Sequence, residues 1–265
     1  MIRFASCLLF TVFLTFFSIS VKAQNTANLY YIIKKEKVED GSLKLVYRDQ
    51  NDSVRPIQMC YPRLKAEGLY VEDGVPVFHF RRIPSTEFDA VPDCISNSTP
   101  LGRFEIDLRK RKIGDTHKIA KLPFRAINWN ASLTLYKIRP GQNGNPVFAV
   151  SDPASMLVSV IYGYTFGFSK IDHESITNYY TTIGPFVGIT SASLTSETVT
   201  NPQLLAKDQS NVAYSYGLSA VLGRNNFGFS LSFGFDASIG KNSSLWIYQH
   251  KPWFGIGVSA GLGMF

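Results

Sequence analysis

Residues 227–235 read FGFSLSFGF, a strict alternation of large apolar and small side chains. Successive side chains of a β-strand point to opposite faces, so this stretch predicts a strand with one large apolar face and one face of Gly and Ser. A half-exposed strand of a soluble sheet places polar residues on its watery face. Residues 227–235 contain no Lys, Arg, Asp or Glu, so the pattern favours a strand whose apolar face meets lipid.

The same alternation recurs along the rest of the last 140 residues. It covers six stretches: Ala126–Arg139, Met156–Ser169, Tyr179–Ser193, Val212–Gly223, Phe227–Gly240 and Trp253–Phe265. Each is about 12–15 residues long, which exceeds the usual five or six and the 9–11 or so that a tilted strand needs to cross a bilayer. Lys or Arg on a lipid-facing strand surface costs about 2–4 kcal/mol near the midplane. The low charge of these stretches therefore predicts an all-β fold, an antiparallel transmembrane β-barrel with a narrow interior.

The alternation also assigns side chains to the two faces of each strand. In Ala126–Arg139, the odd positions from Ile127 to Leu135 are expected on the apolar face. The even positions, Tyr136 among them, are expected on the opposite face. In the other stretches the face opposite the apolar residues holds mainly Gly, Ser and Thr, and such small side chains suit a filled interior better than a wide pore.

A break in charge density divides the chain. Residues 24–125 carry 18 Lys+Arg and 14 Asp+Glu, whereas residues 126–265 carry 7 and 6. We therefore expect a polar, mainly β region at 24–125 and the barrel at 126–265. Strands in the front region are expected in Leu29–Lys37, Ser42–Tyr47, Val75–Arg81 and Arg103–Lys110, with a short helix near Arg63–Leu69.

Residues 1–23 predict a secretory signal peptide. Arg3 gives the positive start, Cys7–Ile19 is apolar, and Val21-Lys22-Ala23 suits cleavage between Ala23 and Gln24. The apolar run is too short for the alternative, a membrane anchor. No run of 18 apolar residues follows residue 23, which argues against a helical membrane protein. We therefore expect export through the Sec pathway.

Export would place Cys60 and Cys94 in an oxidising compartment. A pair of cysteines in such a compartment is a candidate disulfide, and two buried free thiols are the alternative. Neither cysteine has the spacing of a metal site.

Long and short connections alternate between the predicted strands. The links Pro140–Ala154 and Thr195–Ser210 are long, Lys170–Ser175 and the turn at 224–226 are short, and Lys241–Lys251 is intermediate. In outer-membrane barrels the longer loops are external and the short turns periplasmic. Both ends of the barrel segment, and the region before it, are therefore expected in the periplasm.

Aromatic residues gather near the predicted strand ends, as they do where a barrel meets both membrane interfaces. The inner rim is expected to hold residues 162–168, Tyr179, Trp129 and Phe227, and the outer rim Tyr136, Tyr214, Phe235, Trp246 and Trp253.

The signal peptide, the alternating strands and the closing residues 255–265, GIGVSAGLGMF, resemble outer-membrane β-barrel proteins, and most of all the small porin-like proteins of Bacteroidota. In that family a terminal aromatic, here Phe265, belongs to the signal read by the barrel-assembly machinery. The last apolar series occupies even positions, whereas Phe265 is odd. The resemblance implies outer-membrane lipid as a partner, with a periplasmic or envelope protein as a further one, and a structural, interaction or narrow-channel role. Asp52-Ser53-Val54 also resembles the O-glycosylation acceptor motif of Bacteroidota.

The number of strands is the open point of this prediction. Six good strands are present, whereas single-chain bacterial barrels begin at eight. We expect eight strands, with Leu29–Lys37 and Pro146–Ser151 as the candidates for the missing ones. A barrel closed by several chains is the alternative.

No motif for a nucleotide cofactor or a metal occurs, so no cofactor is expected, and the net charge of +7 does not demand a nucleic-acid partner. An outer-membrane enzyme acting on lipid A or phospholipid is one alternative function. Its Ser, His and Asp would come from Asp236, Ser243, Ser244 and His250, since a His beside an Asp can activate a Ser. A secreted soluble β-sandwich adhesin is another alternative. We expect no catalytic site.

Overall fold

The computed structural model describes residues 29–34, 36–37, 43, 45–49, 54–56, 63–72, 75–80, 102–106, 120–141, 149–150, 156–171 and 175–262. The predicted cleavage site at Ala23 and Gln24, the cysteines Cys60 and Cys94, and the residues Ser53 and Phe265 lie outside them.

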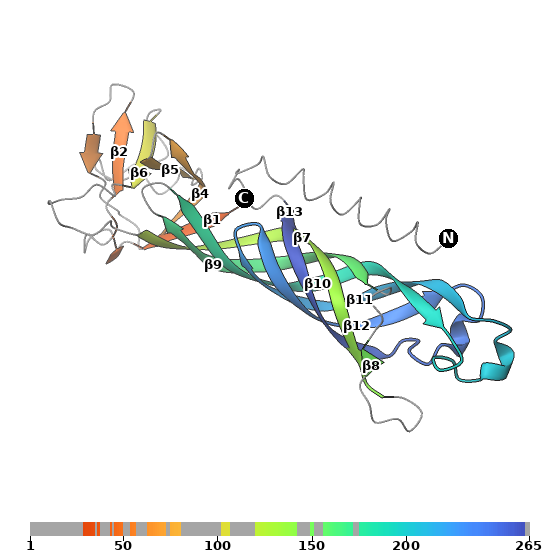
Figure 1. The fold of residues 1–265 in the computed structure, drawn as a ribbon. Coiled ribbons are helices and arrows are strands. Elements are labelled where there is room, and N and C mark those ends of the chain that lie inside the picture. Colours follow the sequence, from red (N-terminus) through yellow and green to blue (C-terminus); the bar gives the residue numbers. More distant parts are fainter. Residues whose placement is uncertain are drawn as a thin grey trace, which may run out of the picture. The chain divides into compact units, whose positions relative to one another are not determined.

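The fold is all-β and antiparallel (Figure 1). Its strands are β1 (Tyr30–Lys34), β2 (Leu45–Asp49), β3 (Val54–Pro56), β4 (Arg63–Glu72), β5 (Val75–Phe80), β6 (Gly102–Ile106), β7 (Ala120–Arg139), β8 (Ala149–Val150), β9 (Leu157–Ile171), β10 (Ile176–Leu194), β11 (Gln209–Arg224), β12 (Phe227–Ile239) and β13 (Pro252–Leu262). Two 3-10 turns, η4 (Pro202–Leu204) and η5 (Ser243–Leu245), lie in the longer connections. The order is β13-β12-β11-β10-β9-β7-β1-β4-β5-β6-β2-β3, with β8 beside β7. Because β13 also pairs with β7, the strands β7 and β9–β13 form a closed ring.

The six alternating stretches correspond to the six strands of this ring, with ends that differ by a few residues. The expected count of eight is not confirmed, because the described strands close the ring with six. The two extra candidates do form strands, but neither enters the ring. Strand β1 pairs with β7 at Tyr30 and Tyr31 and with β4 on its other edge, and β8 pairs with the end of β7 at Ile138 and Arg139.

In the front region, the predicted strands appear as β1, β2, β5 and β6. The predicted helix at Arg63–Leu69 is wrong, since Arg63–Glu72 is strand β4. This segment pairs with β1 on one edge and β5 on the other, so tertiary pairing overrides a weak local preference.

The chain divides into two compact units. Among the described residues, the ring unit comprises Ile127–Thr165 and Thr181–Leu262, and the front unit comprises those of Gln24–Ala126 and Phe166–Tyr180.

The front unit has a conventional apolar core. Tyr31 and Phe124 are fully buried and meet edge to face at 6.0 Å between ring centroids. The Ser169 hydroxyl donates to the Tyr31 hydroxyl at 3.0 Å, and burial raises the pKa of Tyr31 to about 12.

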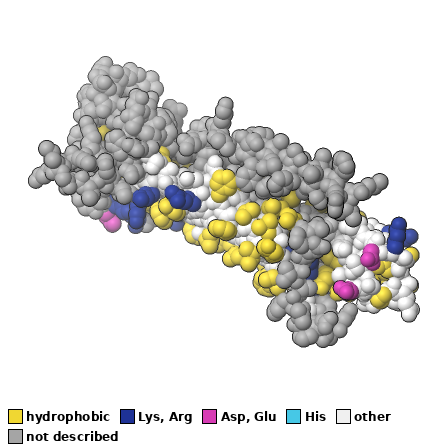
Figure 2. All heavy atoms as spheres, viewed as in Figure 1, with side chains coloured by type: hydrophobic (Ala, Val, Ile, Leu, Met, Phe, Trp, Pro, Cys, Tyr) yellow, Lys and Arg dark blue, Asp and Glu magenta, His cyan; other side chains and the backbone are white. Residues whose placement is uncertain are grey.

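The ring unit has the opposite polarity. Its outward faces are apolar, as Figure 2 shows over the strands, and its buried residues are largely Ser, Thr, Asn and Gly. The exposed apolar residues of β11, β12 and β13 include Val212, Leu218, Leu222, Phe229, Leu231, Phe254 and Ile256. The predicted alternation of faces is thus confirmed for these strands.

Strand β7 passes from one polarity to the other without changing its alternation. Up to Ala126, its inward residues are apolar, and Lys121 and Arg125 are exposed. From Ile127 onward the outward residues are apolar, with Ile127 60% and Trp129 54% exposed, and the inward ones are polar, beginning with Asn128. The environment preferred by the outward face therefore changes from water to an apolar medium between Arg125 and Ile127.

A β-bulge corrects the predicted facing of the end of β7. Ile256 of β13 lies opposite Tyr136, whereas Gly257 lies opposite Thr134, so Leu135 is the extra residue. Tyr136 consequently points outward and Lys137 is buried, the reverse of a strict odd–even pattern. Bulges re-aim side chains in this way, and this one turns Lys137 and Arg139 away from the apolar surface.

Deletion of Leu135 should remove the bulge and keep Lys137 and Arg139 inward, because Thr134, Tyr136 and Lys137 then alternate strictly in the register that β13 already imposes. The ion pairs with Asp236 should persist, so the free energy of unfolding should fall by less than the roughly 2–4 kcal/mol that a charge on the apolar surface costs. Urea unfolding in detergent micelles, followed by tryptophan fluorescence, measures the change. Deletion of Asn201 in the exposed loop is the control, and a loss of about 2–4 kcal/mol relative to this control would refute the assignment of Leu135 as the extra residue.

Candidate functional site

The interior of the ring unit is filled by side chains. Gly217 and Gly234 face each other on β11 and β12, and a Cβ on either would lie 3.0 Å or less from the ring of Phe186. These glycines therefore leave room for Phe186, which contacts the fully buried Trp253 at 5.7 Å between ring centroids. Large and small residues thus interlock across the interior.

A buried cluster of three charges lies beside this aromatic pair. Lys137 Nζ donates to Asp236 Oδ1 at 3.0 Å and Oδ2 at 3.1 Å, and Arg139 Nη2 donates to Oδ2 at 2.6 Å. The Ser215 hydroxyl donates to the same carboxylate and accepts from Lys137 Nζ at 3.2 Å. Lys137, Arg139, Asp236 and Ser215, which we call the charge cluster, connect β7, β11 and β12.

Aromatic rings cover both cations of the charge cluster. Lys137 Nζ lies 4.5 Å from the centroid of the Trp253 ring. The Arg139 guanidinium lies 5.6 Å from the Trp246 ring and 5.0 Å from the Tyr248 ring. Ring faces attract cations, so these contacts offset part of the desolvation that burial imposes on two positive charges sharing one carboxylate.

The two longer connections that follow β10 and β12 pack together over this end of the interior. Val199 forms a bridge with Trp246, and the Thr200 amide donates to the Leu245 carbonyl at 2.8 Å. Trp246 is buried in an apolar cluster with Ala192, Leu194, Val199 and Ala213. The placement of Trp246 and Trp253 at an exposed outer rim is therefore wrong, since both are buried.

Hydroxyl and amide groups are frequent elsewhere in the interior. Ser132 bonds Ser230 at 2.9 Å, and Ser219 bonds Ser232 at 2.9 Å. The Thr165 hydroxyl donates to the side-chain oxygen of Asn128, Oδ1, at 2.5 Å. Several short hydroxyl side chains thus satisfy one another across the interior, whereas the side chains of Asn130, Thr134 and Ser259 have buried polar atoms without a partner among the described residues.

The predicted Ser–His–Asp group is not assembled. The Asp236 carboxylate is fully buried in the charge cluster, whereas His250 is exposed. Their one contact joins backbones, with the His250 amide donating to the Asp236 carbonyl at 2.8 Å. Ser243 and Ser244 lie in η5, and neither contacts the carboxylate.

The residues that could hold a metal are also dispersed. Within the described ranges, no three His, Cys, Asp or Glu side chains come together as a metal site. No helix among the residues described is both long and apolar enough to cross a membrane.

The charge cluster was not predicted from the sequence. Strict alternation continued beyond Leu135 would place Lys137 and Arg139 on the outward face, and the sequence suggests Asp236 only as a catalytic carboxylate. A usable signal was present, because Asp236 is an acidic residue within an otherwise uncharged stretch and two basic residues stand at alternate positions, 137 and 139, in another.

Comparison with known proteins gives no relative. No family model matches the chain, and no curated protein or solved structure matches it.

The substitution Asp236→Asn should destabilise the ring more than Lys137→Met. Asp236→Asn leaves two buried cations without a counter-charge, which should cost about 3–5 kcal/mol. Lys137→Met leaves the Arg139–Asp236 ion pair in place and keeps an apolar chain against Trp253, so we expect about 1–2 kcal/mol. Urea unfolding in detergent micelles compares the free energies of unfolding of the two variants with that of the wild-type protein.

Ser219→Ala, which removes one interior hydroxyl of the same unit, is the matched control and should have the smallest effect. If Asp236→Asn were no more harmful than this control, the charge cluster would not stabilise the ring.

Proposed function

We propose that the chain is an integral β-barrel protein of a bacterial outer membrane, with a structural or interaction role. The observation that carries the proposal is the inverted polarity of the ring unit, with exposed Phe, Leu, Ile and Val outside and buried hydroxyls and charges inside. A large exposed apolar surface marks an interaction site, and one that encircles a closed sheet fits the hydrocarbon of a bilayer.

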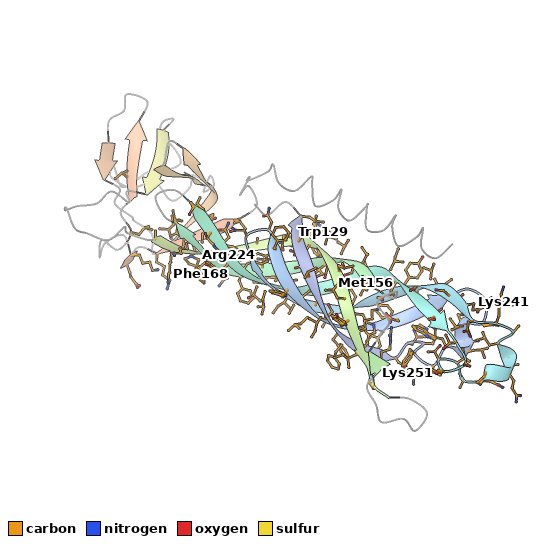
Figure 3. The ribbon with its side chains drawn as sticks, in the orientation of Figure 1. Trp129, Met156, Phe168, Arg224, Lys241 and Lys251 are labelled. Carbon is orange, nitrogen blue, oxygen red and sulfur yellow. The ribbon has the colours of Figure 1, made fainter. Side chains whose placement is uncertain are left out.

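The dimensions of the strands agree with a bilayer. Strand β13 has 11 residues, which at about 3.4 Å per residue and a tilt of about 45° span about 26 Å along the membrane normal. This matches the apolar band of about 25 Å in outer-membrane barrels. The charges Glu197, Lys207, Asp208, Lys241 and Lys251 are exposed in the connections after β10 and β12, and Figure 3 labels Lys241 and Lys251 there.

Connection lengths support an orientation. Strands β11 and β12 are joined by a tight turn in which Asn225 has a φ of 53°, whereas the connections from Leu194 to Gln209 and from Ile239 to Pro252 are longer. Longer loops are external in outer-membrane barrels. Together with the signal peptide predicted from residues 1–23, this pattern supports export and a front region in the periplasm, and insertion by the barrel-assembly machinery belongs to the same proposal.

The filled interior favours an anchor or interaction protein over an open pore. Phe186, Trp253 and the charge cluster occupy the interior. The proposed barrel is the ring of six described strands, two fewer than the smallest single-chain barrels of bacteria. Its interior is correspondingly narrow, because barrel diameter grows with strand number.

Tryptophan fluorescence tests the proposed membrane insertion. Trp129 is exposed on the outward face, whereas the other two tryptophans, Trp246 and Trp253, are buried. After reconstitution into phosphatidylcholine vesicles, lipids with brominated acyl chains should quench Trp129 strongly, because heavy atoms quench on contact. Trp129→Phe gives the background from the two interior tryptophans. A compact monomer that stays soluble without detergent, with unquenched Trp129, would refute the proposal and favour the soluble adhesin.

Conductance separates an anchor from a narrow channel. In planar bilayers the wild-type protein should show no ion-conducting steps, because side chains fill its interior. Reproducible steps from wild-type protein whose insertion is confirmed by quenching would favour the channel role.

A further inference from the structure

We propose that the outward side chains of Lys121, Arg125 and Lys170 in the front unit bind the phosphate groups of anionic phospholipids at the membrane surface. This inference rests on the proposed membrane insertion and names a lipid class that the barrel recognises. With the aromatic residues Phe168 and Tyr179, these three cations form what we call the basic collar.

The basic collar lies on three neighbouring strands of the front unit. Lys121 and Arg125 are exposed on one face of β7. Lys170 and Phe168 alternate with buried residues on β9, so they share its outward face. Tyr179 lies near the start of β10, where its ring stacks on Phe168 at 5.3 Å between centroids. Strand β9 lies between β7 and β10 in the sheet.

The aromatic and basic side chains of the collar contact one another. Lys121 Nζ lies 6.0 Å from the centroid of the Phe168 ring, which is itself 40% exposed and is labelled in Figure 3. A lysine that lays its stem along an aromatic surface and keeps its ammonium in water is typical of a membrane interface, as is the aromatic ring beneath it.

The charges of the basic collar are not neutralised within the described structure. None of Lys121, Arg125 and Lys170 forms an ion pair with a described carboxylate. The described outward residues of these strand ends include three cations and no Asp or Glu. A surface of one sign favours a partner of the opposite sign.

The position of the collar along β7 selects lipid phosphate as that partner. Arg125 is two residues from Ile127 and four from Trp129 on the same outward face, where the exposed residues become apolar. A phosphate held by Arg125 would have its acyl chains beside Ile127 and Trp129. Strands β9 and β10 are joined by the short link between Ile171 and Ile176, and short turns face the periplasm, so the lipids are those of the phospholipid leaflet.

Quenching of Trp129 by two brominated lipids measures the preference of the basic collar for an anionic phospholipid over a zwitterionic one. The full mature chain is reconstituted into phosphatidylcholine vesicles that contain either brominated phosphatidylglycerol or brominated phosphatidylcholine. Each Lys or Arg near an anionic surface adds up to about fivefold in affinity. We therefore expect the fraction of phosphatidylglycerol among the lipids beside Trp129 to exceed its mole fraction in the vesicle at least about threefold. Salt at 0.5 M should reduce this preference, because it screens the charges.

Removal of the collar charges should abolish this preference. The variant Lys121→Gln/Arg125→Gln/Lys170→Gln should quench equally with both lipids. The matched control is Lys207→Gln/Lys241→Gln/Lys251→Gln, which removes three exposed cations from the connections after β10 and β12 and should keep the wild-type preference. The charge-preserving variant Lys121→Arg/Arg125→Lys/Lys170→Arg should also keep it.

Equal quenching of the wild-type protein by both lipids would overturn the inference, and so would an undiminished preference for phosphatidylglycerol in the collar variant. A third set of vesicles contains brominated lipid A. Stronger quenching by this lipid than by brominated phosphatidylglycerol would also overturn the inference. If the collar variant does not fold, Arg125→Gln alone decides, and an unchanged preference there also overturns the inference. Absence of quenching by either lipid would instead refute the proposed insertion, so the two failures are distinguishable.

Discussion

The ring depends on one constraint, the cost of burying polar groups inside a sheet whose outer surface is apolar. Most large apolar side chains of the ring strands point outward, and the buried apolar residues form local clusters such as the one around Trp246. A buried polar group without a partner costs about 1–3 kcal/mol, so inward hydroxyls and charges are stabilised by partners across the narrow interior. The charge cluster and the serine pairs have such partners, whereas the side-chain amide of Asn130 and the hydroxyls of Thr134 and Ser259 have none among the described residues.

Narrowness and polarity reinforce each other. Glycines such as Gly217 and Gly234 allow facing residues to approach closely, and close approach brings short hydroxyl side chains within hydrogen-bonding distance. The same glycines leave room for two large rings, Phe186 and Trp253, and the Trp253 ring lies against the Lys137 ammonium. The interior thus combines a tilted aromatic pair with an ionic cluster.

Most of the ring could be predicted from the sequence, because period-two alternation reports directly which residues share a face. The stretch 227–235 and its counterparts identify all six ring strands. The bulge at Leu135 could not be predicted, because it depends on the register between β7 and β13. Without the bulge, strict alternation would direct Lys137 outward, so the charge cluster could not be predicted from the sequence. The sequence predicts strands at the positions of β1 and β8, but it does not predict the strands with which they pair, since pairing is a tertiary property.

The single carboxylate of the cluster links the beginning of the ring to its end. Lys137 and Arg139 lie on the first ring strand of the chain, whereas Asp236 lies on β12, the last but one. An assembly intermediate that lacks the final hairpin holds two cations without their counter-ion. Closure of the ring neutralises these two cations and is stabilised by it. Ring closure is therefore close to all-or-none, and truncated or misthreaded forms are disfavoured.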